Sequence, residues 1–345
     1  MAGDQQRADV SVIIVNHNAG ARLLRCLAGL KAQTLEPLEV LLVDNASADG
    51  SFRTALAHHP WVTPMPMDAN LGFAAANNRA AERARGSWIA LLNPDAYPQE
   101  DWLEELLAGV RRWPGADAFG STQLQDARPE ILDGAGDCLH VLGVPYRGFF
   151  GWHRRALPPE APVLGACAAA ALYRRARFIE LGGFDESFFC YCEDLDLALR
   201  LALDGGESVQ LPAAVVRHEG SGITGALSGF AIYHGHRNRF LMLANTMPPA
   251  LFWGLLPVQL IVAGLFIAIF YGRGHGGAYG RAVRDALVEI PGRRRRRARG
   301  QDNPARTLRL ARSLVWSPLA LVRRRGKTLA GKTKRGNERI RAQHP

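Results

Sequence analysis

The chain has 345 residues, enough for one large α/β domain and an appendage, and 48% of them are hydrophobic, which excludes a wholly disordered protein. Its formal net charge of +10 is unevenly distributed, because residues 272–345 hold 21 Lys or Arg against 4 Asp or Glu, whereas residues 1–271 hold 21 against 28. The basic character therefore belongs to the C-terminal part. This argues against nucleic-acid binding by the body of the protein, and we expect no nucleic-acid partner.

Cysteine usage and the N-terminal residues favour a reducing compartment. The five cysteines are odd in number and show no zinc-like spacing, and Cys190 and Cys192 are too close for an ordinary disulfide. Residues 1–10 lack the apolar core of a signal peptide. We therefore expect the body to lie in the cytosol.

The first part of the chain alternates between expected strands and helices. Apolar, β-branched runs predict buried strands at 10–18, 38–44, 61–67 and 87–95, and helical spacing predicts helices at 20–33, 70–86 and 99–113. This alternation predicts an α/β fold with a parallel, mostly doubly wound sheet, in which ligands bind beyond the carboxyl ends of the strands. The polar residues expected at those ends are Asn16, Asn18, Asp44, Asn93 and Asp95.

Two common nucleotide-binding motifs are missing from the sequence. No G-x-G-x-x-G follows the first strand, and there is no Walker A loop. A nicotinamide dehydrogenase and a P-loop NTPase are therefore disfavoured. A divalent cation is the usual substitute for a glycine-rich loop at a nucleotide's phosphates, and Asp95 is placed to hold Mg²⁺ or Mn²⁺.

The second part of the body contains a cluster of acids. Residues 114–160 are expected to form loops and short strands, and 165–175 a strand. Glu193, Asp194 and Asp196 then open an expected helix, which is followed by a strand and His218. The helix dipole alone can explain acids at such a position. Because the preceding FDESFFCY is apolar and aromatic, however, a poorly solvated carboxylate here is a candidate base.

Four segments, taken in order, resemble a family 2 glycosyltransferase of the GT-A fold, within its rhamnosyltransferase-like branch. VSVIIVNHN and VDNASADGS resemble the two nucleotide-binding strands, and LLNPD stands where the family has its metal-binding DxD. GGFDESFFCYCEDLDLALRLALDGG resembles the acceptor-side segment with its ED motif. The resemblance covers about residues 10–225 and implies a catalytic domain over residues 1–230.

The resemblance implies a role for each matching residue near the reacting atoms. Asp194 would be the general base, and Glu193 would orient it or contact the acceptor. Asp95 and His218 would bind the metal. Asn93 occupies the first acidic position of DxD, which leaves Asp95 as the main carboxylate.

Residues on the donor side also match. Asp44 would hydrogen-bond the pyrimidine base of the donor, although capping of the turn at 45–49 explains it as well. Asn70 and Gly72 belong to an NxGF turn beside the donor, where a helix start entered through Gly72 is an equal alternative. Asn16 and Asn18 would contact the donor at the end of the first strand.

The activity implied by the resemblance is an inverting, metal-dependent sugar transfer from a nucleotide-diphospho-sugar. One carboxylate would deprotonate the acceptor hydroxyl, while the metal stabilises the leaving diphosphate on the other side of the sugar. The branch favours dTDP-rhamnose, with a UDP-sugar second. The alternatives are a nucleotidyltransferase on a similar sheet and a catalytically inactive membrane scaffold or basic nucleic-acid binder. Arg200 lies almost opposite Asp194 on the helix, so we expect a structural role for it.

Residues 231–272 predict a helix followed by a membrane-associated segment. Residues 251–271 carry no charge, and only Pro257 and Gln259 interrupt the apolar run, which is long enough to span a bilayer. A single crossing would place the basic tail outside the cell, against the positive-inside tendency. We therefore expect a re-entrant or interfacial segment at the cytoplasmic face of the membrane.

Residues 273–345 predict a basic amphipathic tail. Arg306, Arg309 and Arg312 fall on one face of an expected helix, and the other face holds Leu308, Leu310, Ala311, Leu314 and Val315. Such a helix suits an anionic membrane surface, and a solvated basic tail is the alternative. Membrane attachment would suit a glycolipid or growing glycan of the cell envelope as acceptor.

Overall fold

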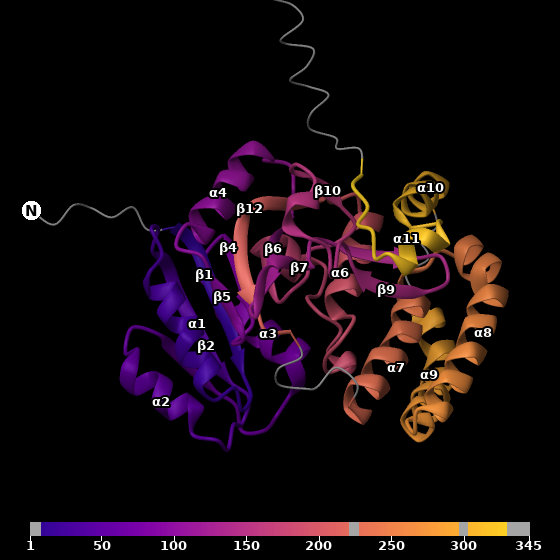
Figure 1. Cartoon of the computed structure of the whole chain (residues 1–345), viewed down its shortest axis with the longest axis horizontal. Coiled ribbons are helices and arrows are strands. Elements are labelled where there is room, and N and C mark those ends of the chain that lie inside the picture. The colour runs from indigo at the N-terminus through magenta and orange to yellow at the C-terminus, as the bar shows by residue number, and fades with distance from the viewer. Residues whose placement is uncertain (1–7, 221–227, 297–302, 330–345) are drawn as a thin grey trace, which may run out of the picture.

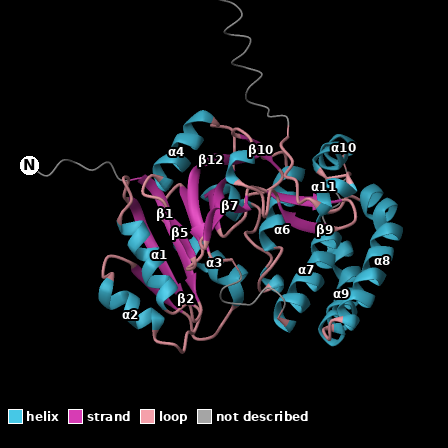
Figure 2. Cartoon of the chain, viewed as in Figure 1, coloured by secondary structure: helices cyan, strands magenta, loops and turns pink. Residues whose placement is uncertain are grey.

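The computed structural model describes residues 8–220, 228–296 and 303–329. Figure 1 shows an α/β body with the C-terminal helices stacked against the side opposite α1 and α2. In Figure 2 the strands of the central sheet lie between helices on both faces. The predicted α/β class with a mostly parallel central sheet is confirmed.

The N-terminal part follows the predicted alternation. Its strands pair in parallel in the order β4-β1-β2-β3, so their carboxyl ends meet at one edge. Residues of β1 alternate between two cores: Val12 and Ile14 pack with α1, α2 and α4, and Ile13 and Val15 pack with α3. The elements are β1 (Ala8–Asn16), α1 (Ala21–Lys31), β2 (Pro37–Asp44), α2 (Ser51–His58), β3 (Thr63–Pro66), α3 (Gly72–Arg83), β4 (Trp88–Leu92), β5 (Ala96–Pro98) and α4 (Trp102–Arg112).

The second half of the sheet is mixed. Strand β11 runs antiparallel between β4 and β6, and β12 lies parallel to β6. Strands β10 and β5 pair antiparallel with β12, and β7 pairs antiparallel with β6. The elements are β6 (Ala118–Gln125), β7 (Arg128–Gly134), β10 (Ala161–Val163), β11 (Ala170–Arg174), α5 (Arg175–Glu180), η2 (Glu186–Phe188), α6 (Glu193–Leu203) and β12 (Ser208–His218).

The expectation of loops and short strands alone over 114–160 was wrong. Strand β6 is a long strand of the central sheet, although its sequence AFGSTQLQ lacks an apolar run. Its buried polar residues are tolerated because they are hydrogen-bonded: Ser121 accepts from Trp102 Nε1 at 2.8 Å, and Thr122 donates to the Leu211 carbonyl at 3.3 Å. Hydrophobic periodicity therefore does not reveal this strand.

A small second sheet and the end of the described chain form one layer. Strands β8 (Asp137–His140) and β9 (Val144–Arg147) pair antiparallel, with η1 (Arg154–Ala156) beyond them. Val315 donates to the Leu139 carbonyl at 2.9 Å, and Phe149 donates to the Arg324 carbonyl at 2.6 Å. The part of the basic tail that the structure describes is thus packed on the body.

Five helices complete the structure: α7 (Gly229–Thr246), α8 (Pro249–Gly272), α9 (Gly276–Arg296), α10 (Pro304–Ser313) and α11 (Pro318–Val322). Helix α9 packs between α7 and α8 and was not predicted as a separate element. Arg293, from the basic run, pairs with Asp185 at 2.6 Å instead of facing solvent. Helix α10 matches the expected amphipathic helix and buries Leu310, but Leu308 is more than half exposed. The proposed division of the chain at residues 230 and 272 stays a prediction.

Candidate active site

A cavity of about 360 Å³ lies at the carboxyl edge of the parallel strands. Residues from both halves of the sheet, from the loop before α6 and from the start of α7 line it. Of the predicted site residues, the cavity wall includes Asn70, Gly72, Asn93, Asp95, Glu193, Asp194 and His218. Asn16, Asn18 and Asp44 lie beside the cavity and are not part of its wall.

Asn16 and Asp44 are the central residues of a hydrogen-bond network behind the cavity wall. Asn16 Nδ2 lies within hydrogen-bond distance of Asp44 Oδ1, at 2.9 Å, and of the hydroxyls of Ser47 and Ser51. Asp44 Oδ2 accepts from the Ser47 amide at 3.2 Å, which is the turn-capping geometry. Asn18 has a φ of 54° and ties the neighbouring turn, because its Oδ1 accepts from the Ala48 amide at 2.8 Å. Contact of these three residues with a donor stays a prediction.

Two residues that the sequence did not single out form the wall at the ends of β1 and β2. His17 Nδ1 donates to the Asn45 carbonyl at 2.9 Å, which leaves Nε2 as an acceptor, 3.2 Å from Asn70 Nδ2. Asn45 Nδ2 donates to Asn70 Oδ1 at 2.8 Å. His17 follows Asn16 and Asn45 follows Asp44, both predicted site residues at strand ends. That neighbouring position is the feature of the sequence that could have indicated them.

Gly72 lies where the start of α3 contacts the loop before α6. Its φ is +82°, and a Cβ built there would lie 2.5 Å from Phe189 Cδ2 and 2.6 Å from the Phe189 carbonyl oxygen. The amide of Ala74 donates to that same carbonyl at 3.1 Å. Both the backbone conformation and the close approach require glycine.

Asp95 and His218 face each other because β5 and β12 pair with His218 opposite Ala96. His218 Nε2 lies 3.3 Å from Asp95 Oδ1 and has no aligned hydrogen-bond partner among the described residues. On the other side, His218 Nδ1 donates to Asp133 Oδ2 at 2.8 Å. Burial lowers the pKa of His218, but hydrogen bonding to Asp133 and the charge of Asp95 outweigh it and raise the pKa to about 9.

These residues fit a hard divalent cation. A carboxylate and an imidazole nitrogen meet at one point, and the imidazole is oriented by a second carboxylate, as is usual for a metal-binding histidine. Arg147 pairs with Asp133 and also lines the cavity. Asp133 and Arg147 come from the segment expected to form loops and short strands, and no pattern in the sequence indicated them.

The loop that leads into α6 is strained and held in place by α7. Phe189, Tyr191 and Cys192 have φ values of 64°, 73° and 70°, which are unusual for residues other than glycine. Asn238 Nδ2 lies within hydrogen-bond distance of three carbonyls of this loop, those of Phe188 and Cys190 at 2.8 Å and that of Tyr191 at 3.0 Å. Asn238 therefore fixes the backbone that aims the first turn of α6 at the cavity.

Of the three neighbouring acids Asp137, Glu193 and Asp194, the half-buried Asp194 is best suited to carry a negative charge. Its carboxylate accepts from the amides of Ala168 at 3.1 Å and Leu195 at 2.8 Å. Burial raises the pKa of all three acids, and the backbone hydrogen bonds oppose this rise at Asp194. Glu193 and Asp137 each have one oxygen without a partner among the described residues. Asp194 therefore gives up its proton more readily than these two acids.

A second group of potential metal ligands includes Asp194. One ligand atom each of Asp137, Cys167 and Asp194 lies within 4.8 Å of the others. Burial raises the pKa of Cys167, and both acids raise it further, so the sulfur stays a thiol. A protonated, soft sulfur is a poor ligand for Mg²⁺ or Mn²⁺. Asp95 and His218 fit such an ion better.

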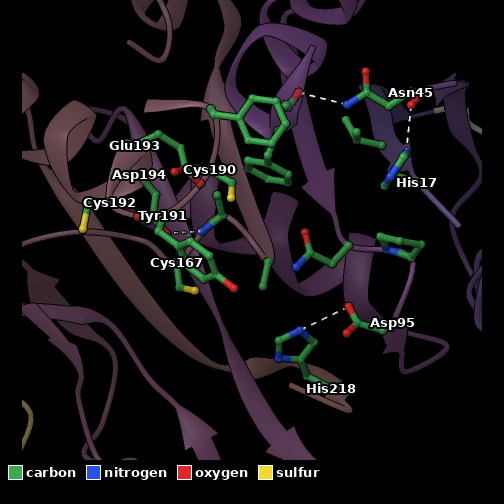
Figure 3. A pocket seen from close by; sticks show the side chains of 18 of the residues that line it. His17, Asn45, Asp95, Cys167, Cys190, Tyr191, Cys192, Glu193, Asp194 and His218 are labelled. Carbon is green, nitrogen blue, oxygen red and sulfur yellow. Dashed lines mark hydrogen bonds and ion pairs between the residues drawn. The ribbon is translucent and has the colours of Figure 1, made fainter. Parts of the chain in front are cut away.

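Figure 3 shows how the side chains are distributed around the cavity. Glu193 and Asp194 lie on one side, and the facing pair of Asp95 and His218 lies across from them. His17 and Asn45 form a third side at the strand ends. A molecule in the cavity would contact the carboxyl groups of Glu193 and Asp194 on one side and the pair of Asp95 and His218 on another.

Arg200 has the structural role that was predicted. It pairs with the buried Asp196 at 2.7 Å and donates to the carbonyls of Leu181 and Gly183. It thereby fixes α6 to the segment that precedes the loop. Arg200 does not line the cavity.

Sequence comparison identifies the family. The pattern of glycosyl transferase family 2 matches residues 11–181. The N-acetylglucosaminyl-diphospho-decaprenol L-rhamnosyltransferase of Mycobacterium tuberculosis is 32% identical over 259 residues, which cover 68% of this chain and 83% of the relative. Rhamnosyltransferase WbbL of Escherichia coli is 28% identical over 220 residues, or 59% of this chain and 81% of the relative. The chain belongs to the family 2 glycosyltransferases and is similar to their rhamnosyltransferases.

A solved structure supports the fold independently. The mannosyltransferase PcManGT from Pyrobaculum calidifontis, solved with GDP-Man and Mn²⁺, superposes with a TM-score of 0.51 at 17% identity, over 98% of this chain and 85% of that one. The GT-A fold is thus confirmed. Family membership removes the nucleotidyltransferase alternative.

Proposed function

We propose that the chain is an inverting, metal-dependent glycosyltransferase. It moves a sugar from a nucleotide-diphospho-sugar to a lipid-linked or polysaccharide acceptor at the cytoplasmic face of the membrane. One observation carries this proposal: the cavity places the carboxyl group of Asp194 across from Asp95 and His218. An in-line displacement needs a base and a leaving-group site on opposite sides of the sugar, and it inverts the anomeric carbon.

Asp194 takes the proton of the acceptor hydroxyl as that oxygen attacks the anomeric carbon. The two backbone amides hold its carboxylate in one orientation. Burial raises the pKa of Glu193 and Asp137 well above the ordinary range, so both hold their protons more tightly than Asp194 does. A positioned base of this kind contributes roughly 10²–10⁴-fold in rate.

Asp95 and His218 would hold a divalent cation against the donor's diphosphate, and a cation there neutralises the charge that develops on the leaving oxygens. Asp133 fixes the ring of His218 with Nε2 directed at Asp95. Because Asp133 and Asp95 raise the pKa of His218, binding of a cation at Nε2 would compete with a proton and weaken as pH falls.

Rhamnose is the favoured sugar, with dTDP-rhamnose as donor and a UDP-sugar as the alternative. The support is the similarity to rhamnosyltransferases, one of which is named for N-acetylglucosaminyl-diphospho-decaprenol as acceptor. A lipid-linked acceptor of the cell envelope fits the apolar helix α8 beside the catalytic domain. A catalytically inactive scaffold is the remaining alternative.

The test is the variant Asp194→Asn, assayed for transfer from dTDP-rhamnose and from UDP-sugars to a lipid-linked acceptor. We expect transfer to fall by about 10²–10⁴-fold, while donor affinity stays near that of the wild type, because the base acts mainly in the transition state. Asp204→Asn, the same change at the exposed end of α6, is the control and should keep full activity. Near-normal turnover of Asp194→Asn would show that the base lies elsewhere, and no transfer by the wild type would favour the scaffold.

A further inference from the structure

Helix α8 is apolar almost all round, yet it packs on the protein along its whole length. Its buried residues are Phe252, Gln259, Ala263 and Phe270, and their spacing of seven, four and seven places them on one narrow stripe. The most apolar 18-residue window has a mean hydropathy of 2.2, and 17% of it is buried. The greater part of this apolar surface is therefore uncovered.

The buried stripe of α8 contacts α9 near both of its ends and the layer of β8 and β9 in its middle. Gln259 Nε2 donates to the Val141 carbonyl at 3.4 Å, so the polar residue that interrupts the apolar run faces the protein. Tyr279 donates to the Ala263 carbonyl at 3.2 Å, and its ring stacks on Phe270 with centroids 5.1 Å apart. Arg294 lies over the ring of Phe252 at 4.3 Å.

Polar contacts hold α9 to the catalytic side of the molecule. Tyr233 donates to Asp285 Oδ2 at 2.8 Å, Arg237 pairs with Glu289 at 2.5 Å, and Arg293 pairs with Asp185 at 2.6 Å. Because α9 packs on both α7 and α8, a bilayer-spanning α8 would draw these charged groups into hydrocarbon. Charged groups there cost several kcal/mol each.

Figures 1 and 2 show α8 at the outer edge of the molecule, with α9 and α7 between it and the α/β body. Together α8 and α9 carry an outer apolar surface, in which each residue is more than half exposed: Trp253, Leu260, Ile261, Leu265, Tyr271, Leu287 and Val288. A cavity of about 110 Å³ between the two helices is lined by apolar side chains and Gln259. An uncovered apolar patch of this kind marks an interaction surface.

Positive charge surrounds this surface. Arg273 follows α8, and Arg281 and Arg295 lie on α9, all exposed. Arginines at the rim of an apolar face favour an anionic lipid surface, which each attracts by about 1 kcal/mol. A second copy of the chain on the same face would instead bring like charges together.

We propose that the outer surface of α8 and α9 docks in the plane of an anionic membrane. Helix α8 lies along the surface, its apolar side chains enter the outer part of the hydrocarbon layer, and both of its ends stay on the side of the catalytic domain. This deepens the proposed function, since it rests on action at a membrane, but it does not depend on catalysis.

The first test measures binding of the purified full chain to vesicles of phosphatidylcholine with a minority of phosphatidylglycerol. We expect the double variant Ile261→Glu/Leu265→Glu to bind at least about tenfold more weakly, because carboxylates on this surface oppose insertion. Ile179→Glu, an exposed apolar position on α5, is the matched control and should bind like the wild type. Unchanged binding of the double variant would overturn the proposal.

The second test locates the turn between α8 and α9. Arg273→Cys, and Asp68→Cys as a reporter on the catalytic domain, are treated with a membrane-impermeant maleimide in sealed vesicles of known orientation. Mass spectrometry of peptides separates their labels from those on the native cysteines. In-plane docking predicts that both positions label from the same side. Labelling of residue 273 from the opposite side, or from neither, would overturn the proposal.

Two further outcomes separate the alternatives. Asp194→Asn should bind vesicles like the wild type, so loss of transfer and loss of docking can be told apart. Light scattering without lipid should show no association through this face. A dimer that dissociates in Ile261→Glu/Leu265→Glu, with no vesicle binding by the wild type, would make a second copy the occupant and overturn membrane docking.

Discussion

The N-terminal and C-terminal halves of the cavity wall are built in different ways. In the N-terminal half, neighbouring parallel strands end together, and neutral side chains such as Asn45 and Asn70, with Asn16 behind them, hold the turns by short hydrogen bonds. In the C-terminal half, buried charged groups come from distant segments, and His218 meets Asp133 across 85 positions of sequence. The N-terminal half is thus a scaffold set by local geometry, whereas the C-terminal half depends on long-range charge pairing.

The largest expected effect is loss of the cation site. We expect Asp95→Ala to abolish the metal-dependent part of dTDP and UDP binding, measured by calorimetry with Mn²⁺ and with EDTA, because it removes the carboxylate that faces His218. Asp133→Asn should weaken Mn²⁺ binding by about 10–100-fold, since the imidazole loses its orienting partner. Asp101→Ala, an exposed acid, is the control. Metal-dependent binding that survives in Asp95→Ala would place the cation elsewhere.

The next largest expected effect is on stability, and it comes from the contact between Gly72 and Phe189. Gly72→Ala should lower the free energy of unfolding by about 2–4 kcal/mol in urea, because it forces a side chain into positive φ and against Phe189. Gly50 also has positive φ, but a Cβ there meets nothing within 4 Å, so Gly50→Ala should cost less. Equal losses for the two variants would show that the contact with Phe189 contributes nothing.

The acids of the C-terminal half predict a pH effect. The raised pKa of Asp194 means that activity is lost as pH falls through a value above the ordinary range of aspartate. The charge of Arg147 lowers the pKa of Asp194, so Arg147→Gln should move the acidic limb of the pH–rate profile to higher pH. Asp137 holds its proton more tightly than Asp194, so Asp137→Asn should leave that limb in place, as should Asp204→Asn. A shift to lower pH in Arg147→Gln would contradict this account.

The smallest expected effect is on stability, and it comes from a surface ion pair between α1 and the turn after β6. Arg25 on α1 makes two hydrogen bonds to Asp126 after β6, at 2.6 and 2.7 Å, and Arg25→Gln should cost less than about 1 kcal/mol of stability. Arg25 lowers the pKa of Asp126, so this contribution is present at neutral pH and lost as Asp126 is protonated in acid. Arg53→Gln, at an exposed position on α2, is the control for urea unfolding at both pH values.

The same contrast explains what the sequence could reveal. Strands β1, β2 and β4 are apolar runs with polar ends, so their positions and the edge where ligands bind follow from local pattern. The acids of α6 stood out because an aromatic segment precedes them. Strand β6 was missed because its buried positions are polar and hydrogen-bonded. Asp133 and Arg147 were missed because the pairing of Asp133 with His218 and with Arg147 is set by the folded chain alone.

Asn238 was also beyond prediction as a site residue. The sequence placed it in the helix after the catalytic domain, but nothing local indicates an amide that reaches three carbonyls of another segment. The assignment of Asp95, Asp194 and His218 came from motif resemblance, and the structure adds the hydrogen bonds and burial that would make such roles work.

The contacts of Asn238 with three loop carbonyls also impose an order on assembly. The segment bearing Asp194 leaves the ribosome before α7 does, and a loop with three residues at positive φ has little reason to keep that shape without Asn238. The sheet and the strand-end turns can form earlier, from contacts within the first part of the chain. Competence for transfer is therefore acquired only after α7 has been made and has docked on the loop before α6.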